Sequence, residues 1–288
     1  MLYVVPCQGD ALFIHDYKIN EYLIGEKDAD LAASYTGQTM LIDKNTRYTG
    51  SWMKRIFGRV EENRETTHFL LDKDQIRQIN WYKQTVFVFP FEKLTDITWI
   101  KQQNKADKET KEFLKGRYSV STPKLTINQL PGKVKVNKYR CRHVEADLRL
   151  ETRDLKKNAV SITLLKQDLW LSDDVPGLDE YNDFHKNLAK KTGLDAERLG
   201  SLSFLLRYWE GSLDPIRESL SAVKGYPVKS LLTVKGKYIK DVGTDSSKTH
   251  SFQIKEESVE LREVHLNNPD GDRFKVPADF KVTTVANP

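Results

Sequence analysis

The segment 177–224 constrains the fold most, because it reads as a block of amphipathic helices with strand-like sequence on both sides. In its first part, apolar side chains recur at the spacings of three and four that are typical of one helix face: Leu178, Tyr181, Phe184 and Leu188. Farther along, Asp214-Pro215 supplies a helix cap and a first-turn proline, and Gly225 ends the block. Helices inserted between strands predict a lid over one face of an antiparallel sheet.

A second helix is expected to begin near Asp195, which can cap its first turn. The lid residues expected to meet a ligand lie on its apolar stripe: Leu202, Leu205, Leu206 and Trp209. Phe87 and Phe89 are their expected partners on the sheet, since both point to one face of a strand over 84–89. The same side chains would also form an ordinary core by packing on one another, and the pattern alone leaves both readings open.

Outside this block the chain reads as strands separated by polar turns, except for residues 92–117, which favour a short surface helix or a connector. Turns are expected at 25–30, where the sequence is GEKDAD, and at 44–46. Strands are expected at 12–23, 31–42, 66–71, 76–79, 84–89, 124–149, 160–171, 227–237 and 250–266, with a short piece around 274–282. No repeat or linker interrupts the chain, so residues 12–288 are expected to form a single domain.

Composition excludes several classes of protein. The 46 basic and 41 acidic residues of this 288-residue chain are interleaved, so no basic stripe for nucleic acid is formed. No apolar stretch approaches the length of a transmembrane helix. A hydrophobic content of 39% is nevertheless enough for a packed core.

Residues 1–11 resemble the tail end of a secretory signal, with a short apolar run from Leu2 to Pro6 and small residues at Gly9 and Ala11. The alternative is a first strand. A signal remnant predicts an exported protein, periplasmic or secreted. Cys7 would leave with it, or would anchor the chain to a membrane, while Cys141 would remain as a small buried hydrophobe.

No motif carries reaction chemistry. The sequence lacks a GxSxG elbow, a phosphate-binding loop and HExxH spacing among its histidines, so neither an enzyme nor a cofactor is expected. Cys141 and His143 share one strand face, but two ligands are too few for a structural zinc site. Lys44 and Arg47, at an expected strand end, are read either as a solvated turn or as contacts for a polar head group.

Several phrases, in order along nearly the whole chain, resemble bacterial exported proteins of unknown function that share the fold of LolA, the periplasmic lipoprotein carrier. The matching phrases are QTMLIDKNTR (38–47), FLLDKD (69–74), KQTVF (83–87), DLWLS (168–172), VPG (175–177), YPVKS (226–230) and FKVPADF (274–280). Arg47 is followed by Tyr48, so the carrier's Arg-Pro pair is missing. The resemblance implies an α+β fold in which a curved antiparallel sheet forms an incomplete barrel, with the helical lid 177–224 inserted between strands.

The expected function is therefore non-enzymatic: an exported protein of the bacterial envelope that binds a lipid or another apolar ligand in a concave sheet under the lid. The alternative is an interaction or sensor module with the same fold and a filled cavity, whose partner is another envelope protein. A shared fold does not by itself choose between them.

Overall fold

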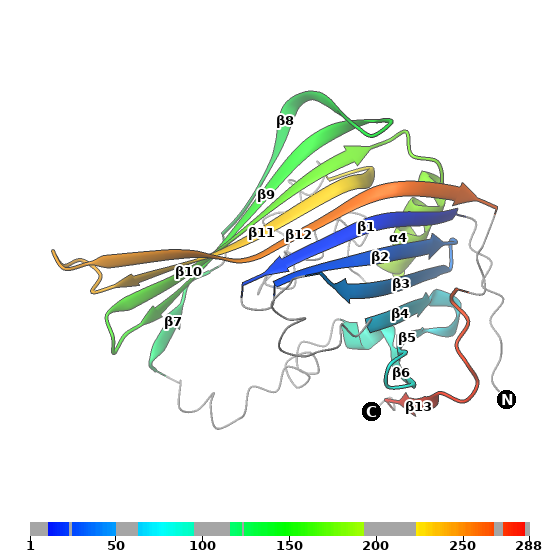
Figure 1. Ribbon diagram of the computed structural model, residues 1–288, viewed down its shortest axis with the longest axis horizontal. Helices are drawn as coiled ribbons and strands as arrows, with labels where there is room; N and C mark the ends of the chain where they lie inside the picture. The colour runs from blue at the N-terminus through cyan, green and yellow to red at the C-terminus, as the bar shows by residue number, and fades with distance from the viewer. Residues whose placement is uncertain are drawn as a thin grey trace.

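The computed structural model describes residues 11–22, 25–49, 63–94, 116–122, 124–192, 223–267 and 273–285. Figure 1 shows one strongly twisted sheet with a helix against one face. The sheet has 13 strands in the order β13-β6-β5-β4-β3-β2-β1-β12-β11-β10-β9-β7, and β8 also pairs with β9. All neighbours are antiparallel except β13 and β6, which run parallel.

The strands are β1 (Ala11–Glu21), β2 (Gly25–Tyr35), β3 (Thr39–Tyr48), β4 (Asn63–Leu70), β5 (Gln75–Asn80), β6 (Thr85–Pro90), β7 (Tyr118–Val120), β8 (Lys124–Val136), β9 (Tyr139–Asp154), β10 (Ala159–Ser172), β11 (Tyr226–Lys240), β12 (Lys248–Leu266) and β13 (Lys281–Thr284). The helix is α4 (Leu178–Thr192), and single 3-10 turns are η1 (Leu71–Lys73) and η2 (Phe91–Leu94). β9 to β12 extend well past the ends of β1 to β6 (Figure 1). The expected strands at 66–71, 76–79, 84–89, 160–171, 227–237 and 250–266 and the helix beginning at Leu178 are confirmed, with bounds shifted by a few residues. The single strand expected up to Arg149 is instead a hairpin of β8 and β9, which turns at Asn137 and Lys138.

The expected α+β class with an incomplete barrel is wrong. The structure is mostly sheet, open and mixed, and its end strands β13 and β7 do not pair with each other. Within the described residues α4 is the single α-helix, and 193–222, where the rest of the lid was expected, lie outside them. The sequence pattern identifies strands but not how many join, and the parallel β13–β6 pairing depends on a long-range contact that periodicity cannot reveal.

Two expected turns are also strands. Residues 25–30 form half of β2, and residues 44–46 lie inside β3. The polar side chains of GEKDAD have low strand propensity, but β2 is paired on both sides, by β1 and β3. Its charges also find partners, since Lys27 Nζ lies 3.0 Å from Glu21 Oε2. Pairing with neighbouring strands therefore outweighs local propensity here, and the real turn falls at Thr36–Gln38.

We call the face of the sheet on which α4 packs the inner face, and the opposite one the outer face. The main core lies between α4 and the inner face, where Phe13, Tyr35 and Phe184 are buried together. On the outer face, residues 273–280 cover β1 to β6 through two smaller clusters. Phe274 packs with Leu12 and Leu41 in one of them, and Phe280 packs with Ile79 and Val86 in the other. β6 is thus apolar on both faces, as its sequence predicts.

No helix in the described part of the chain has the length and apolarity needed to cross a membrane.

Candidate functional site: the inner face of the sheet

Strand register assigns the apolar side chains to the inner face across the sheet. From Ala11, which pairs with Tyr35 beside α4, every second residue of β1 is buried up to Ile19. Residues that pair across neighbouring strands point to the same face of the sheet. Pairing from Ile19 through β12, β11, β10 and β9 therefore places Leu232 and Ala146 on the same face as Ile19. The inner face therefore carries three buried apolar clusters, with the buried polar side chains of Glu257 and Gln167 in the row between them.

One end of this surface is packed by α4. The turn before the helix uses Gly177 at φ +81°, and Leu178 N–H donates to the Val175 carbonyl as the helix begins. Acidic residues in the first turn and lysines in the last complement the helix dipole. The helix buries Tyr181 and Phe184, whose rings contact Tyr35 with centroids 5.3 and 6.0 Å apart.

Polar contacts fix the helix in place. Asn187 Nδ2 donates to the Gly37 carbonyl at 2.8 Å, in the turn between β2 and β3. Lys191 Nζ donates to the Leu71 carbonyl at 2.5 Å and lies 3.2 Å from Asp74 Oδ1. These contacts tie both middle and end of α4 to the β1–β6 half of the sheet.

The structure places two of the predicted site residues beside α4. Phe89 is 3% exposed and belongs to the cluster of Tyr35 and Phe184, while Phe87 is partly buried against it. Their rings lie 5.6 Å apart. At this end the side chains pack on one another as a core, which was the alternative reading. The other predicted residues, Leu202, Leu205, Leu206 and Trp209, lie outside the described residues.

The second half of the inner face has no α4 residue in its clusters. One cluster holds Tyr17, Ile19 and Ala29, and the other contains Leu165, Leu232 and Val234 among its members. Val223, near the end of the block 177–224 that was expected to form the lid, is 1% exposed and packs into the second of these clusters. This residue of the expected lid therefore contacts the inner face.

Ionisable groups interrupt this apolar half, and sequence reasoning missed most of them. Glu257 lies between Ile19 and Leu232 in the register and is 2% exposed. Burial raises the pKa of its carboxyl to about 7, although Lys255 Nζ lies 2.7 Å from Oε2. Lys44 also faces inward, since it pairs with Leu31, and burial lowers its pKa to about 8. Alternation along β12 places Lys255, Glu257, Val259 and Leu261 on one face, and this local pattern could have revealed the inward position of Glu257 from the sequence.

Lys44 and Arg47 therefore do not form a solvated turn together. Both belong to β3, but they point to opposite faces because three residues separate them. Arg47 is exposed and pairs in the register with Asp28 on the outer face.

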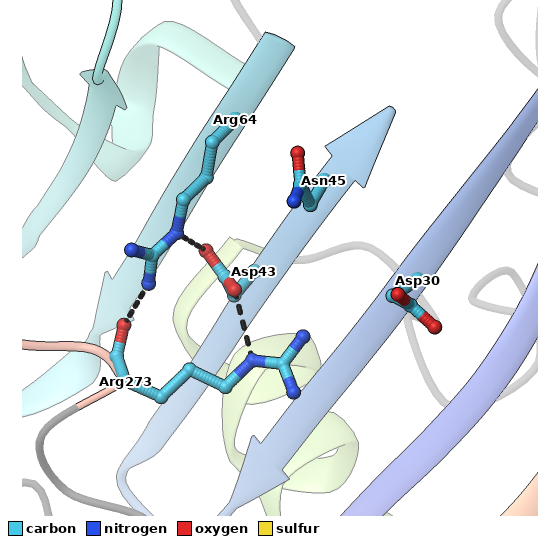
Figure 2. A pocket seen from close by; sticks show the side chains of 5 residues that line it. All are labelled: Asp30, Asp43, Asn45, Arg64 and Arg273. Atoms are coloured by element: carbon cyan, nitrogen blue, oxygen red, sulfur yellow. Dashed lines mark hydrogen bonds and ion pairs between the residues drawn. The ribbon is translucent and has the colours of Figure 1, made fainter. Parts of the chain in front are cut away.

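The outer face carries a polar pocket of about 430 Å³, lined by Asp30, Asp43, Asn45, Arg64 and Arg273 (Figure 2). Asp43 is 2% exposed and accepts hydrogen bonds from Arg64 Nε and Arg273 Nε, both at 2.9 Å, and from Thr66 Oγ1 at 2.7 Å. Arg64 also donates to the Arg273 carbonyl and stacks over Trp81, 3.9 Å from the ring centre. One carboxylate thus holds two guanidinium groups, and this network fastens residue 273 to the sheet.

A possible metal-binding group lies elsewhere on the outer face, at His143, Glu145 and Asp168, whose ligand atoms lie within 4.8 Å of one another. His143 Nε2 already bonds Asp168 Oδ1 at 2.9 Å, and Lys166 Nζ lies 2.7 Å from Glu145 Oε1. The lysine ammonium supplies the positive charge that a metal would bring, so these contacts account for the cluster without an ion. Cys141 is a buried free thiol on the same strand, and burial raises its pKa.

Comparison with models of known protein families and with curated proteins finds no match to this chain.

Proposed function

We propose that this chain is a non-enzymatic protein of the bacterial envelope that binds a lipid or another apolar ligand on the inner face of its sheet. The supporting observation is the division of that face. α4 belongs to the cluster around Tyr35 and to neither of the two clusters around Ile19 and Leu232. An acyl chain requires a dry apolar wall, and burying ten methylene groups is worth about 8 kcal/mol before ordering costs.

The export of the chain, and its likeness to LolA-type proteins, remain part of this proposal. The order of the matching phrases supports both, and the absence of a curated relative leaves them to experiment.

The first test is binding of an environment-sensitive apolar dye to delipidated protein. Trp209→Glu and Leu205→Glu are expected to abolish the fluorescence increase while leaving the β-rich circular dichroism intact. Tyr82→Glu is the control, because Tyr82 is 67% exposed in the turn before β6. Loss of the fold in the two lid variants would instead identify both residues as core.

The second test names the ligand class. Native mass spectrometry of protein secreted to a bacterial periplasm and purified without detergent is expected to show adducts that extract into organic solvent. A clean apo mass, unchanged after incubation with envelope lipids, would contradict lipid binding and favour the interaction module. That alternative requires an apolar patch on the outside. In the described chain, the exposed rings of Tyr22 and Phe252 contact each other, 6.2 Å between centroids, and two rings fall short of such a patch.

A further inference from the structure

β12 is longer than the strand that pairs with it on one side. Residues 255–266 of β12 pair with β1, which ends at Glu21. Tyr22 N–H continues this side by donating to the Ile254 carbonyl at 2.9 Å. Residues 248–253 remain paired with β11 on the other side. Within the part of the chain that the structure describes, these residues therefore have a neighbouring strand on one side only.

We call residues 248–253 the free edge. It belongs to the arm in which β11 and β12 continue beyond the end of β1 (Figure 1). All of its side chains are exposed. The ring of Phe252 leans toward β11 and lies over Gly236, where an added Cβ would stand 2.5 Å from the Phe252 Cζ. In an antiparallel strand every second residue directs its N–H and C=O to the same side, so the free edge presents backbone donors and acceptors at the side of the arm.

The other edges of the sheet carry features that discourage pairing with another chain. β13 and β7 are four and three residues long. β8 contains Pro131, a register shift at 129–133 and three lysines. Short length, proline, bulges and lysine are the features that protect edge strands. The free edge begins after the register shift at Ile254, pairs regularly with β11, and contains no proline and a single lysine, Lys248.

A second copy of the same chain is complementary to this edge. Two antiparallel copies of one strand present matching rows of donors and acceptors, and a two-fold axis between them makes the contact isologous and closed. Antiparallel pairing also places the Lys248 end of one strand beside the Ile254 end of the other, so the two lysines stand apart. A partner strand with many charges would gain no ion pairs from this edge, because it offers one lysine.

We propose that the free edge is an interaction surface at which two copies of this chain pair antiparallel and join their arms into one continuous sheet. Main-chain hydrogen bonds form the contact. A stretch of this length buries less than the roughly 1,200–2,000 Å² of a stable interface, so the dimer is weak and forms at high protein concentration. The contact goes beyond the proposed function, because it involves the arm and not the apolar clusters of the inner face.

Sedimentation velocity of the wild-type chain, from about 10 μM to about 1 mM, tests this pairing, and a shift from monomer to dimer is expected over that range. Ser251→Glu is expected to raise the dissociation constant at least about tenfold, because two-fold pairing brings the two new carboxylates near each other and like charges across a strand pair are destabilising. Within its own chain the new carboxylate lies opposite Lys237 in the register, which favours the folded monomer.

Ser161→Glu is the matched control. Ser161 is also an exposed serine, but β10 is paired on both sides, by β9 and β11. The same change of charge there is expected to leave the dissociation constant unchanged. Circular dichroism checks that each variant keeps its β-rich spectrum. If Ser251→Glu loses that spectrum, Thr249→Lys takes its place, because Thr249 is a second exposed position on the free edge and lysine blocks edge pairing.

Amide hydrogen exchange locates the contact. Exchange within 248–253 is expected to slow at high protein concentration, because hydrogen-bonded amides are protected. The adjoining turn 241–247 is expected to exchange at the same rate at both concentrations. A wild type that stays monomeric up to about 1 mM, or a dimer that the folded edge variant does not weaken, would overturn the proposal. A dimer whose free-edge amides exchange at the monomer rate would place the contact elsewhere and overturn it as well.

Discussion

The Asp43 network on the outer face offers the most direct test of how this sheet is held together. Its carboxylate is buried and accepts from two arginines and Thr66. Arg273 belongs to the segment that continues into Phe274, which is 2% exposed against the outer face. We therefore predict that Asp43→Asn weakens both the network and the docking of residues 273–280.

The expected magnitude follows from the contacts. An asparagine at position 43 keeps one oxygen for Thr66 and Arg64, but its amide N–H groups would face the donor Nε of Arg273. The loss is one charge-assisted hydrogen bond, worth about 1.5–3 kcal/mol. Breaking a fully buried pair costs about 3–5 kcal/mol. Here the side chains of Arg64 and Arg273 are 31% and 23% exposed and can turn to water, so we expect about 2 kcal/mol.

Urea unfolding followed by circular dichroism measures this change in the free energy of unfolding. The double-mutant cycle of Asp43→Asn with Arg273→Met isolates the pair. Asp30→Asn is the control, because Asp30 lines the same pocket but is 43% exposed and contacts Arg262 at 3.4 Å. It is expected to stay within about 0.5 kcal/mol of wild type. A coupling energy near zero, or an equal effect of Asp30→Asn, would refute the reasoning.

Two further predictions concern the backbone and pH. Gly177→Ala is expected to lower the free energy of unfolding, measured in urea, by at least about 1 kcal/mol more than Gly243→Ala. Both glycines have φ near +80°, but only at Gly177 would an added Cβ meet another atom, the Cβ of Ala11 at 2.6 Å. Equal losses in the two variants would show that this close contact is not the cause. Stability is also expected to fall as pH drops from about 6.5 to about 4, because burial lowers to about 4 the pKa of three histidines: His15, His68 and His185. As pH falls, the histidines of the unfolded chain bind protons before those of the folded chain, which lowers the free energy of unfolding by up to about 3 kcal/mol per histidine. Glu257 has the opposite effect between about pH 4.5 and pH 7, because its raised pKa lets the folded chain bind the proton first. Urea titrations across this range check it, and His185→Gln should show a smaller loss than wild type.

The sequence predicts the strands whose side chains alternate and the helix whose apolar spacing is regular. β6, β10 and α4 are found with bounds within a few residues of those expected. The prediction fails where the structure of a segment is decided by pairing with strands elsewhere in the chain. The run GEKDAD becomes a strand because β1 and β3 flank it, and no local pattern announces neighbours so distant in the chain.

The same limit applies to the site. Phe87 and Phe89 are correctly assigned to one face, because alternation along one strand is a local property. The inward position of Lys44 is not predicted, because it requires β3 to continue to Tyr48, whereas the sequence suggested that the strand ends at Asp43. A shift of one residue in a strand moves a side chain to the other face, so an error in a strand end became an error in the site.

Asp43 and Lys44 show why neighbouring charges in this sheet have different consequences. They are adjacent in β3 and point to opposite faces. Asp43 is compensated within the chain, by two guanidinium groups and a hydroxyl, so its burial is explained by folding alone. Lys44 instead lies over the ring of Tyr17, and its neighbour Glu65 in β4 is exposed. Burial lowers the pKa of Lys44. A charge that the described fold leaves uncompensated lowers stability unless something outside the chain compensates it. We therefore assign the pocket around Asp43 to the architecture of the sheet.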